Sequence, residues 1–392
     1  MGFVSFLRRM STVVQNSQNT LFKRDVEKQK RYIASLREPA DDIDRGFLQY
    51  KCQMHLMGII SVFLNIISFF ASLYYLLRLK ECKYDPEGCR AVFLSNGIPE
   101  NVIPAVLVSE FSDIKTENND DFMGLTAEDK KFIKTIIKRY KLSWHFIFKC
   151  ILKTAMYSPR VNSGGIKAVI SCSEYSFTSS VMSAYCENFG VQNINVMHGE
   201  KFYHIRDSFF HYHRCYIWGD FYKDLFIRMR AEPSQFITEI PRSLIFGGQP
   251  CYTKEFDFTY YLSNESSEIL KKINFLLKSL SDMGYRVCIR KHPRYTEENV
   301  FTEIFSQNIE NGKIFAEDNK EVNIEKSLLR SNHCVSLFST VMHQAVLNNV
   351  KIVIDDMSNP EFYNKLRSVE FYCLNVPHEL LSDILKDETA DL

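Results

Sequence analysis

Two residues with acid–base chemistry, His198 and Glu200, stand just after the segment Asn193-Ile-Asn-Val-Met197, which predicts a strand. Histidine exchanges a proton near neutral pH, and the carboxylate two residues away could act as general base in its place. Ligands of open α/β sheets bind beyond the carboxyl ends of the strands, so this position suits a catalytic residue. A structural histidine in a turn is the plainer alternative for the same pattern.

A second set of residues could bind an anion. Lys291 and His292 follow a predicted strand, and Pro293 favours extended backbone at the histidine before it. Ser339 and Thr340 open a predicted helix, where hydroxyls, free backbone N–H groups and the helix dipole attract anions. A solvated basic loop and a simple helix N-cap are the alternatives. Together the clusters predict a nucleotide phosphate site held by charge-assisted hydrogen bonds, with Lys291, His292, Pro293, Ser336, Ser339 and Thr340 as its candidate residues.

Aromatic and histidine side chains are concentrated between residues 203 and 213, and Trp218 closes the next short apolar run. Aromatic faces can stack on sugars, so this region would suit an acceptor cleft, although it would also suit a hydrophobic core. The residues assigned to the acceptor are Glu174, His204, Arg206 and Trp218.

Metal-binding patterns are weak. The four histidines from 198 to 213 lack an HxxxH arrangement with a carboxylate, and the 11 cysteines contain no CxxC pair. Asp42-Ile43-Asp44 has the form DxD but follows no strand, so it is interpreted as a helix-start cap. The glycine loops GxGxxG and GxxxxGK[ST] are absent. We therefore expect no metal and no cofactor, with free thiols in a reducing compartment.

Short β-branched runs alternate with helical periods around these clusters. Strands are expected near 90–95, 167–172, 193–197 and 216–218, and again near 258–262, 285–290, 333–337 and 351–355. Such alternation predicts parallel sheets with right-handed crossovers. The acidic segment 109–126 reads as irregular. The predicted fold class is α/β with two Rossmann-like domains, 90–242 and 243–392.

The first 89 residues form a separate predicted region. The chain is basic up to Arg37, and residues 56–77 make an apolar stretch of 22 residues, long enough to cross a bilayer. Polar residues recur along this stretch at helical spacing, which fits a helix with one face against protein: Ser61, Asn65, Ser68 and Ser72. A spanning helix, an interfacial helix and a buried helical hairpin remain open. The basic flanks favour contact with anionic headgroups.

The composition narrows the class of protein. With 392 residues, 45% hydrophobic and 24% charged, the chain is globular and long enough for two or three domains. Lys+Arg 48 against Asp+Glu 47 gives 48 − 47 = +1, which argues against a dedicated nucleic-acid binder.

Four motifs occur in order: His198-Gly199, Tyr216-Ile217-Trp218-Gly219, Lys291-His292-Pro293 and Ser339-Thr340. The series resembles bacterial surface-polysaccharide glycosyltransferases of the GT-B fold, which make capsule, O-antigen and lipooligosaccharide. This family includes sialyltransferases, polysialyltransferases, Kdo transferases and teichoic-type glycerophosphotransferases. The resemblance covers residues 165–356.

The resemblance implies two Rossmann-like domains facing a cleft, the first for an acceptor and the second for a nucleotide-sugar donor. His292-Pro293 and Ser339-Thr340 match motifs that bind the CMP phosphate in bacterial sialyltransferases. Those enzymes carry an acidic pair before glycine, whereas this chain has His198 before Gly199. That difference is closer to teichoic-type enzymes, in which histidine is the base.

We therefore predict an inverting, metal-independent glycosyltransferase of lipopolysaccharide or capsule synthesis. It would transfer sialic acid, Kdo or a similar sugar from a CMP-linked donor to a glycan or lipid-linked glycan. It would work at the cytoplasmic face of the bacterial inner membrane, as a peripheral or single-span protein with no nucleic-acid partner. The alternatives are a CDP-polyol phosphotransferase, a UDP-sugar glycosyltransferase, an epimerase of the same fold and a non-catalytic membrane-bound assembly component.

Overall fold

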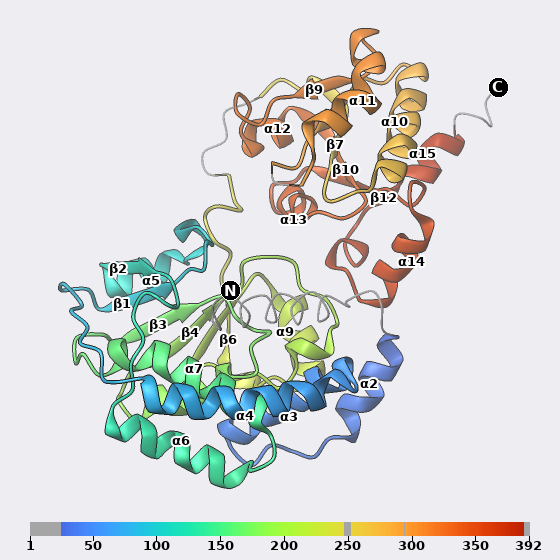
Figure 1. Cartoon of the computed structure of the whole chain (residues 1–392). Coiled ribbons are helices and arrows are strands. Elements are labelled where there is room, and N and C mark those ends of the chain that lie inside the picture. Colours follow the sequence, from blue (N-terminus) through green and yellow to red (C-terminus); the bar gives the residue numbers. More distant parts are fainter. Residues whose placement is uncertain (1–24, 247–251, 294, 388–392) are drawn as a thin grey trace. The chain divides into compact units, whose positions relative to one another are not determined.

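The computed structural model describes residues 25–246, 252–293 and 295–387, which form two compact units (Figure 1). The first unit comprises Met1–His198 and Tyr203–Arg242, and the second comprises Gly199–Phe202 and Ser243–Leu392. The segment Gly199–Phe202 therefore belongs to the second unit although both of its flanks belong to the first.

A parallel six-stranded sheet forms the centre of the first unit, in the order β2-β1-β3-β4-β5-β6. Alternate residues of a strand point to opposite faces. Val92 and Leu94 accordingly pack with the helical layer of α6, α7 and α8, whereas Ala91 and Phe93 pack with α5. Both faces are covered, which is why these strands read as continuous apolar runs. The strands are β1 (Ala91–Leu94), β2 (Ile114–Glu117), β3 (Ala168–Ser171), β4 (Gln192–Val196), β5 (Arg214–Ile217) and β6 (Phe236–Thr238). The helices are α5 (Ala105–Phe111), α6 (Ala127–Arg139), α7 (Trp144–Val161), α8 (Ser179–Glu187) and α9 (Asp220–Arg228), with short 3-10 turns at Glu100–Val102, Ile205–Asp207 and Pro233–Gln235.

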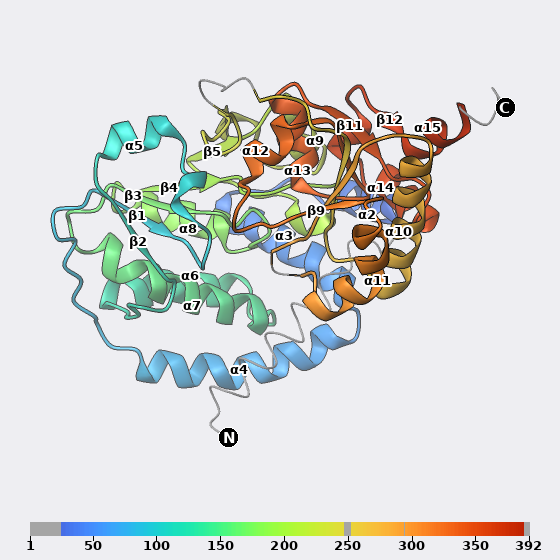
Figure 2. The same ribbon diagram turned by 90° about the horizontal axis from the view of Figure 1, so that it is seen from above.

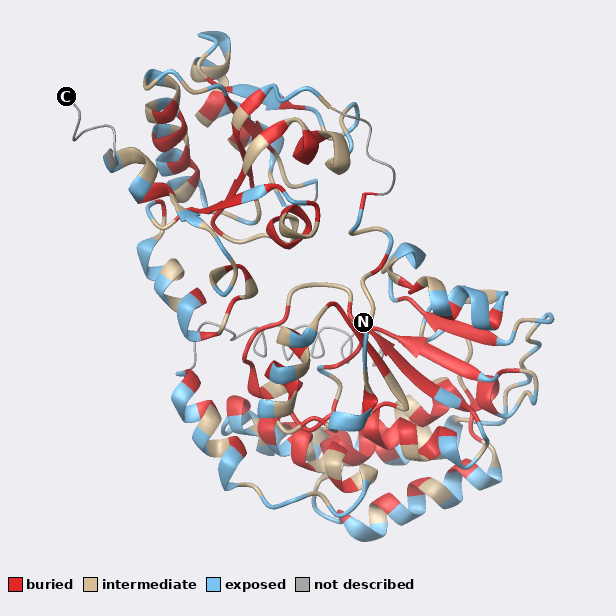
Figure 3. Cartoon of the chain, turned by 180° about the vertical axis from the view of Figure 1, so that it is seen from behind, coloured by how far each residue is buried: buried red, intermediate tan, exposed pale blue. Residues whose placement is uncertain are grey.

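The second unit is built on another parallel six-stranded sheet, in the order β12-β11-β10-β7-β8-β9. Its core joins the inner strands to α10 and α11, and the inner strands of both sheets are buried (red in Figure 3). The strands are β7 (Phe256–Tyr261), β8 (Val287–Arg290), β9 (Phe315–Glu317), β10 (Ser331–Ser336), β11 (Lys351–Ile354) and β12 (Glu379–Leu380). The helices are α10 (Ser267–Asp282), α11 (Glu298–Glu310), α12 (Ile324–Leu329), α13 (Thr340–Leu347), α14 (Pro360–Ser368) and α15 (Leu381–Asp387), with a 3-10 turn at Tyr372–Leu374.

Three N-terminal helices pack on the first unit: α2 (Val26–Ser35), α3 (Asp42–Met57) and α4 (Ile60–Arg78). α3 lies close to α8 at Gly46, where an added Cβ would come within 2.6 Å of the Phe177 carbonyl oxygen. In Figure 2, α4 runs along the outer side of α7, away from the strands. Residues 26–78 are thus part of the packing of this α/β unit. The basic residues before Asp25 lie outside the described part of the chain.

The two sheets confirm the predicted α/β class with two Rossmann-like units. The prediction of an irregular segment 109–126 is wrong in part, because it contains α5's end and strand β2. The sequence also missed β6, β9 and β12. Together with β2, these are the outermost strands of the two sheets.

Candidate functional site

Three predicted site residues follow neighbouring strands of the first sheet. Glu174 comes after β3, His198 after β4 and Trp218 after β5, and these strands are adjacent in the sheet. Their carboxyl ends therefore lie at one edge, the edge at which α/β sheets bind ligands. His198 is partly exposed, whereas Glu174 and Trp218 are buried.

Trp218 has a structural contact at this edge. Its indole Nε1 donates to the Met197 carbonyl oxygen at 3.1 Å, and its ring meets the Tyr222 ring edge-on at 6.2 Å. The side chain is only 5% exposed. Trp218 therefore ties the end of β5 to the residue before His198, and it does not present a ring face for a sugar as the sequence suggested.

Two glutamines of α3 hold the loops that carry the other acceptor candidates. The Gln49 side-chain amide donates to the carbonyl oxygens of Glu174 and Arg206, both at 2.9 Å. The Gln53 amide donates to the Tyr175 carbonyl oxygen at 2.6 Å. No sequence pattern predicts this role, because both glutamines lie in what reads as an ordinary helix. α3 is thus a structural support for the loops after β3 and β4.

His204 and Arg206 differ in their exposure to solvent. Burial lowers the pKa of His204 to about 4, and its Nδ1 accepts the backbone N–H of Arg206 at 3.2 Å. The neutral ring is therefore part of the fold. The Arg206 guanidinium lies over the Tyr175 ring at 5.0 Å and stays partly exposed. Among the predicted acceptor residues, Arg206 is the one that offers a charged group to solvent.

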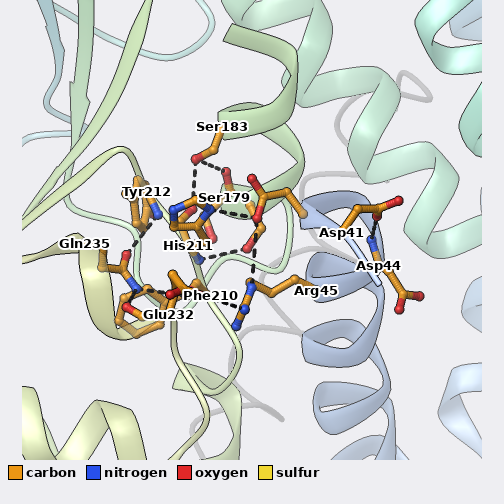
Figure 4. Close-up of polar contacts among 12 residues, drawn as sticks. Asp41, Asp44, Arg45, Ser179, Ser183, Phe210, His211, Tyr212, Glu232 and Gln235 are labelled. Atoms are coloured by element: carbon orange, nitrogen blue, oxygen red, sulfur yellow. Dashed lines mark hydrogen bonds and ion pairs between the residues drawn. The ribbon is translucent and has the colours of Figure 1, made fainter. Parts of the chain in front are cut away.

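In the run 209–213 the aromatic residues Phe209, Phe210 and Tyr212 are buried, whereas His211 and His213 are partly exposed; Figure 4 shows the polar contacts of Phe210, His211 and Tyr212. The His211 ring contacts Asp42 at 2.7 Å, its carbonyl oxygen accepts from Ser183 and its backbone N–H donates to Ser180. Gln235 similarly bonds the backbone of Phe210 and Tyr212. The aromatic residues of this run therefore pack in the core, whereas its two histidines keep partial exposure.

The Asp42-Ile43-Asp44 motif starts a helix, as expected, but the cap is Asp41. The Asp41 carboxylate accepts the Asp44 backbone N–H at 2.8 Å. Asp44 is fully buried, and its carboxylate accepts from Arg37 and from the Tyr140 hydroxyl. Burial would raise the pKa of this carboxyl, but the hydrogen bonds outweigh it and hold the pKa below its usual value. Within the described residues, no group of three or more His, Cys, Asp or Glu could hold a metal ion.

In the second unit, the chain reverses direction across the sheet between β7 and β10. Ligands of doubly wound sheets bind at such a switch point. Ser339 and Thr340 stand there, at the start of α13, with the Ser339 hydroxyl accepting the Val341 backbone N–H at 3.2 Å. Both are partly exposed. Ser336 differs, because it is buried and donates to the Tyr261 carbonyl oxygen, so it serves the sheet rather than a ligand.

Lys291 and His292 follow β8, on the other side of β7 from β10. Lys291 is paired with Glu298, with Nζ–Oε distances of 2.8 and 2.7 Å. The His292 ring stacks on Tyr295 at 4.5 Å, and its backbone N–H donates to Thr296. Pro293 is exposed. The neighbouring Arg290 binds Glu317 and so has a structural partner, while Arg294 lies outside the described residues.

Glu200 has a partner that the sequence analysis missed. Its carboxylate Oε1 lies 2.8 Å from Nδ1 of His343, and both side chains are 2% exposed. His343 lies one turn into α13, stacked on Tyr372 at 4.2 Å. Phe202 packs on Phe338 at 5.3 Å in the same unit. His343 follows the N-cap Ser339 by four residues, so helical spacing could have marked His343 as a neighbour of Ser339 but not as the partner of Glu200.

Glu265 is a second residue that the sequence analysis missed. It follows β7 at the switch point, and its carboxylate accepts the Ser263 backbone N–H at 2.7 Å. Burial, with a smaller effect of Asp355, raises the pKa of Glu265 to about 7. A carboxyl group that titrates near neutral pH at a ligand-binding edge is a candidate functional residue.

Solved structures with a similar course of the chain are remote in sequence. The UDP-GlcNAc 2-epimerase of Methanocaldococcus jannaschii is 10% identical with a TM-score of 0.44, over 76% of this chain and 90% of that chain. The wall teichoic acid polymerase TagF is 11% identical with a TM-score of 0.42, over 86% and 87%. The UDP-GlcNAc 2-epimerase from Neisseria meningitidis is 9% identical with a TM-score of 0.43, over 76% and 90%. No family model and no curated protein matches the chain.

Proposed function

We propose that the protein is an inverting glycosyltransferase that uses a nucleotide-activated sugar, with CMP as the preferred nucleotide. The observation that carries the proposal is the edge of the second sheet, where Ser339-Thr340 and Lys291-His292 follow strands on either side of β7. Hydroxyls at a helix start and two cationic or polar side chains at a switch point suit a phosphate group. The order of these motifs resembles that of bacterial sialyltransferases and related enzymes.

The proposed reaction assigns one role to each group. His198 takes the proton of an acceptor hydroxyl, and the hydroxyl oxygen attacks the anomeric carbon of the donor sugar with inversion. The bond from that carbon to the phosphate oxygen breaks, and the nucleotide leaves with the electron pair. Lys291, His292 and Thr340 stabilise the charge on the leaving phosphate. Glu200 is assigned to the anchoring contact with His343 rather than to proton transfer.

A second candidate is the transfer of a polyol phosphate from a CDP-polyol. The observation that favours it is His198 before Gly199, where sialyltransferases have an acidic pair. A thermal-shift screen with CMP, CDP, UDP and GDP and their sugar or polyol conjugates separates the two functions. Stabilisation by CMP-sugars supports the glycosyltransferase, and stabilisation by CDP-polyols alone supports the second candidate. No shift with any nucleotide would favour a non-catalytic assembly component.

Thr340→Val is expected to weaken binding of the nucleotide by roughly tenfold, because it removes one hydroxyl from the phosphate while keeping the shape of the side chain. Isothermal titration calorimetry with the nucleotide found in the screen measures the change. Ser336→Ala is the matched control, because the Ser336 hydroxyl donates to the Tyr261 carbonyl oxygen and not to a ligand. The affinity of this variant for the nucleotide should stay near that of wild type. Equal losses in both variants would show that the effect is a general weakening of the sheet edge.

The affinity for a nucleotide-sugar is expected to fall severalfold as pH rises from 6 to 8. Glu265, with its pKa raised to about 7, is neutral below that pH and negative above it. A nearby phosphate binds better beside the neutral carboxyl group, so binding weakens as the carboxylate forms. Glu265→Gln should make the affinity independent of pH over this range. An unchanged pH dependence in that variant would remove Glu265 from the site.

We also propose that the enzyme works at the cytoplasmic face of a bacterial inner membrane on a glycan or lipid-linked glycan acceptor. Among the described residues, α4 is the one helix long and apolar enough, by length and composition, to cross a membrane. Cell fractionation followed by immunoblotting tests the location: recovery of the protein with the membrane fraction supports it, and recovery with the soluble fraction alone contradicts it.

A further inference from the structure

Helix α4 carries a continuous apolar stripe that is exposed in the described part of the chain. Its exposed large residues recur at spacings of three and four, which places them along one side of the helix. Among them Phe63 is 61% exposed, Phe70 64% and Leu77 83%. The full set is Ile59, Ile60, Val62, Phe63, Ile66, Phe70, Leu73, Tyr74 and Leu77. So many adjoining apolar side chains on one helix mark an interaction surface.

The opposite side of α4 is fixed to the first unit by polar contacts. The Ser68 hydroxyl lies 3.0 Å from Nδ1 of His145, and the Asn65 carboxamide oxygen accepts the His145 backbone N–H at 3.1 Å. Asn65 also contacts the Tyr50 hydroxyl on α3. The buried residues of the helix are Leu64, Ser68, Ala71 and Ser72. Of the four polar positions predicted to face protein, Ser68 and Ser72 are buried and Asn65 bonds α7, whereas the Ser61 hydroxyl bonds Gly58 of its own turn.

These contacts argue against a spanning helix. To cross a bilayer, α4 would have to leave α7 and place Asn65 and Ser68 in hydrocarbon without their contacts to His145, which is costly. Leaving would also uncover the apolar side of α7, where Trp144 meets Phe69 at 4.7 Å and Phe148 lies near Tyr75. A helix with one side held by protein and the other apolar can instead lie in the plane of a membrane surface.

The charges beside the stripe complement an anionic lipid surface. Lys51 lies before α4, Arg78 ends it, and Lys80 and Lys83 follow it with Glu81 between them; all five are exposed, and the four cations outnumber the one acid. Exposed Lys141 and Leu142, the latter 88% exposed, lie just before Trp144 and extend the same combination of cation and apolar side chain. Cations of this kind attract phosphate headgroups.

We propose that α4 docks the protein on an anionic lipid bilayer, lying in the interface with its exposed stripe buried among the headgroups and the first acyl carbons. This deepens the proposed membrane location by naming the surface and its orientation, and it does not depend on the reaction catalysed. Because α3 precedes α4 by a short turn at Gly58 and its Gln49 supports the Glu174 and Arg206 loops, docking of α4 would tether these loops to the membrane-bound part of the chain.

The test is flotation of the full chain with vesicles of phosphatidylethanolamine and phosphatidylglycerol, and with vesicles of phosphatidylcholine as the neutral comparison. Wild type should bind the anionic vesicles and bind the neutral ones less. The variant F63S/F70S/L77S should lower the bound fraction about tenfold or more, because these side chains are exposed and their loss leaves the fold intact. The matched control is F275S/F315S, which changes two exposed phenylalanines of the second unit and should bind like wild type.

Two further measurements keep the orientation testable. Arg78→Gln with Lys80→Gln and Lys83→Gln should remove most of the preference for anionic vesicles. Protein bound to bacterial membranes should be released by alkaline carbonate, as expected for an interfacial helix. Wild-type binding by F63S/F70S/L77S would overturn the proposal, and so would resistance to carbonate. A dimer that dissociates only in F63S/F70S/L77S would assign the stripe to a second copy of the chain and also overturn it. Failure of nucleotide binding would affect only the proposed enzyme.

Discussion

His198→Ala is expected to lower kcat by about 10²–10⁴-fold while leaving the affinity for the nucleotide donor unchanged, because a positioned general base contributes that factor. The residue follows β4 at the ligand-binding edge of the first sheet and is partly exposed. Steady-state kinetics with the donor found by the screen, together with calorimetry of donor binding, separates loss of the base from loss of the fold.

Glu200→Gln is the matched control, because it keeps the side-chain shape and an oxygen that can accept from His343. It should retain turnover within roughly tenfold of wild type, since the lost charge lies in an anchoring contact. The reverse result would make Glu200 the base: Glu200→Gln would then show the loss of turnover predicted for His198→Ala, and His198→Ala would stay active. His343→Ala removes the contact with Glu200 but leaves the Glu200 carboxylate in place, so its turnover shows how much of the loss comes from this contact.

Arg160→Met is expected to lower the free energy of unfolding of the first unit by about 3 kcal/mol, the lower end of the cost of breaking a buried ion pair. The Glu117 carboxylate loses its guanidinium but keeps the Tyr84 hydroxyl at 2.9 Å and Lys115 at 3.6 Å. Arg160 is fully buried in α7, and its Nε donates to the Glu117 carboxylate at 2.8 Å. Its guanidinium also bonds the carbonyl oxygens of Asn118 and Phe122. The arginine therefore holds both the end of β2 and the loop that follows it.

Urea unfolding followed by tryptophan fluorescence measures this change selectively, because the two tryptophans, Trp144 and Trp218, both lie in the first unit. The double variant Arg160→Met with Glu117→Gln should recover part of the lost stability, since the stranded carboxylate becomes a neutral amide. A double variant less stable than the single one would mean that Arg160 acts through its backbone contacts and not through its charge.

The strands that could be predicted are those in the middle of each sheet. β1 reads Ala-Val-Phe-Leu and β3 reads Ala-Val-Ile-Ser, and every position of both is buried, so these strands are almost entirely apolar and stand out from the helices. The outermost strands pair on one side only and need few apolar residues. β2 reads Ile-Lys-Thr-Glu and β12 has only two residues, so neither pattern differs from a loop.

The site residues that could be predicted are those whose position depends on their neighbours along the sequence. Ser339 and Thr340 start a helix and His198 ends a strand, and both facts follow from the neighbouring residues. Burial is a tertiary property, which is why Ser336 and Trp218 seemed available and are not. The contact of Glu200 with His343 joins residues 143 positions apart, and no local pattern reports it.

The assignment of Gly199–Phe202 to the second unit has a consequence for dissecting the protein. A fragment ending at Arg242 would keep these four residues but lose Phe338 and His343. Phe202 would then lose its contact with Phe338, and the Glu200 carboxylate would lose its contact with His343. A fragment starting at Ser243 would have a gap where Phe202 and Glu200 belong. Neither half is expected to behave as an independent module, and circular permutation or complementation would have to preserve this four-residue insertion.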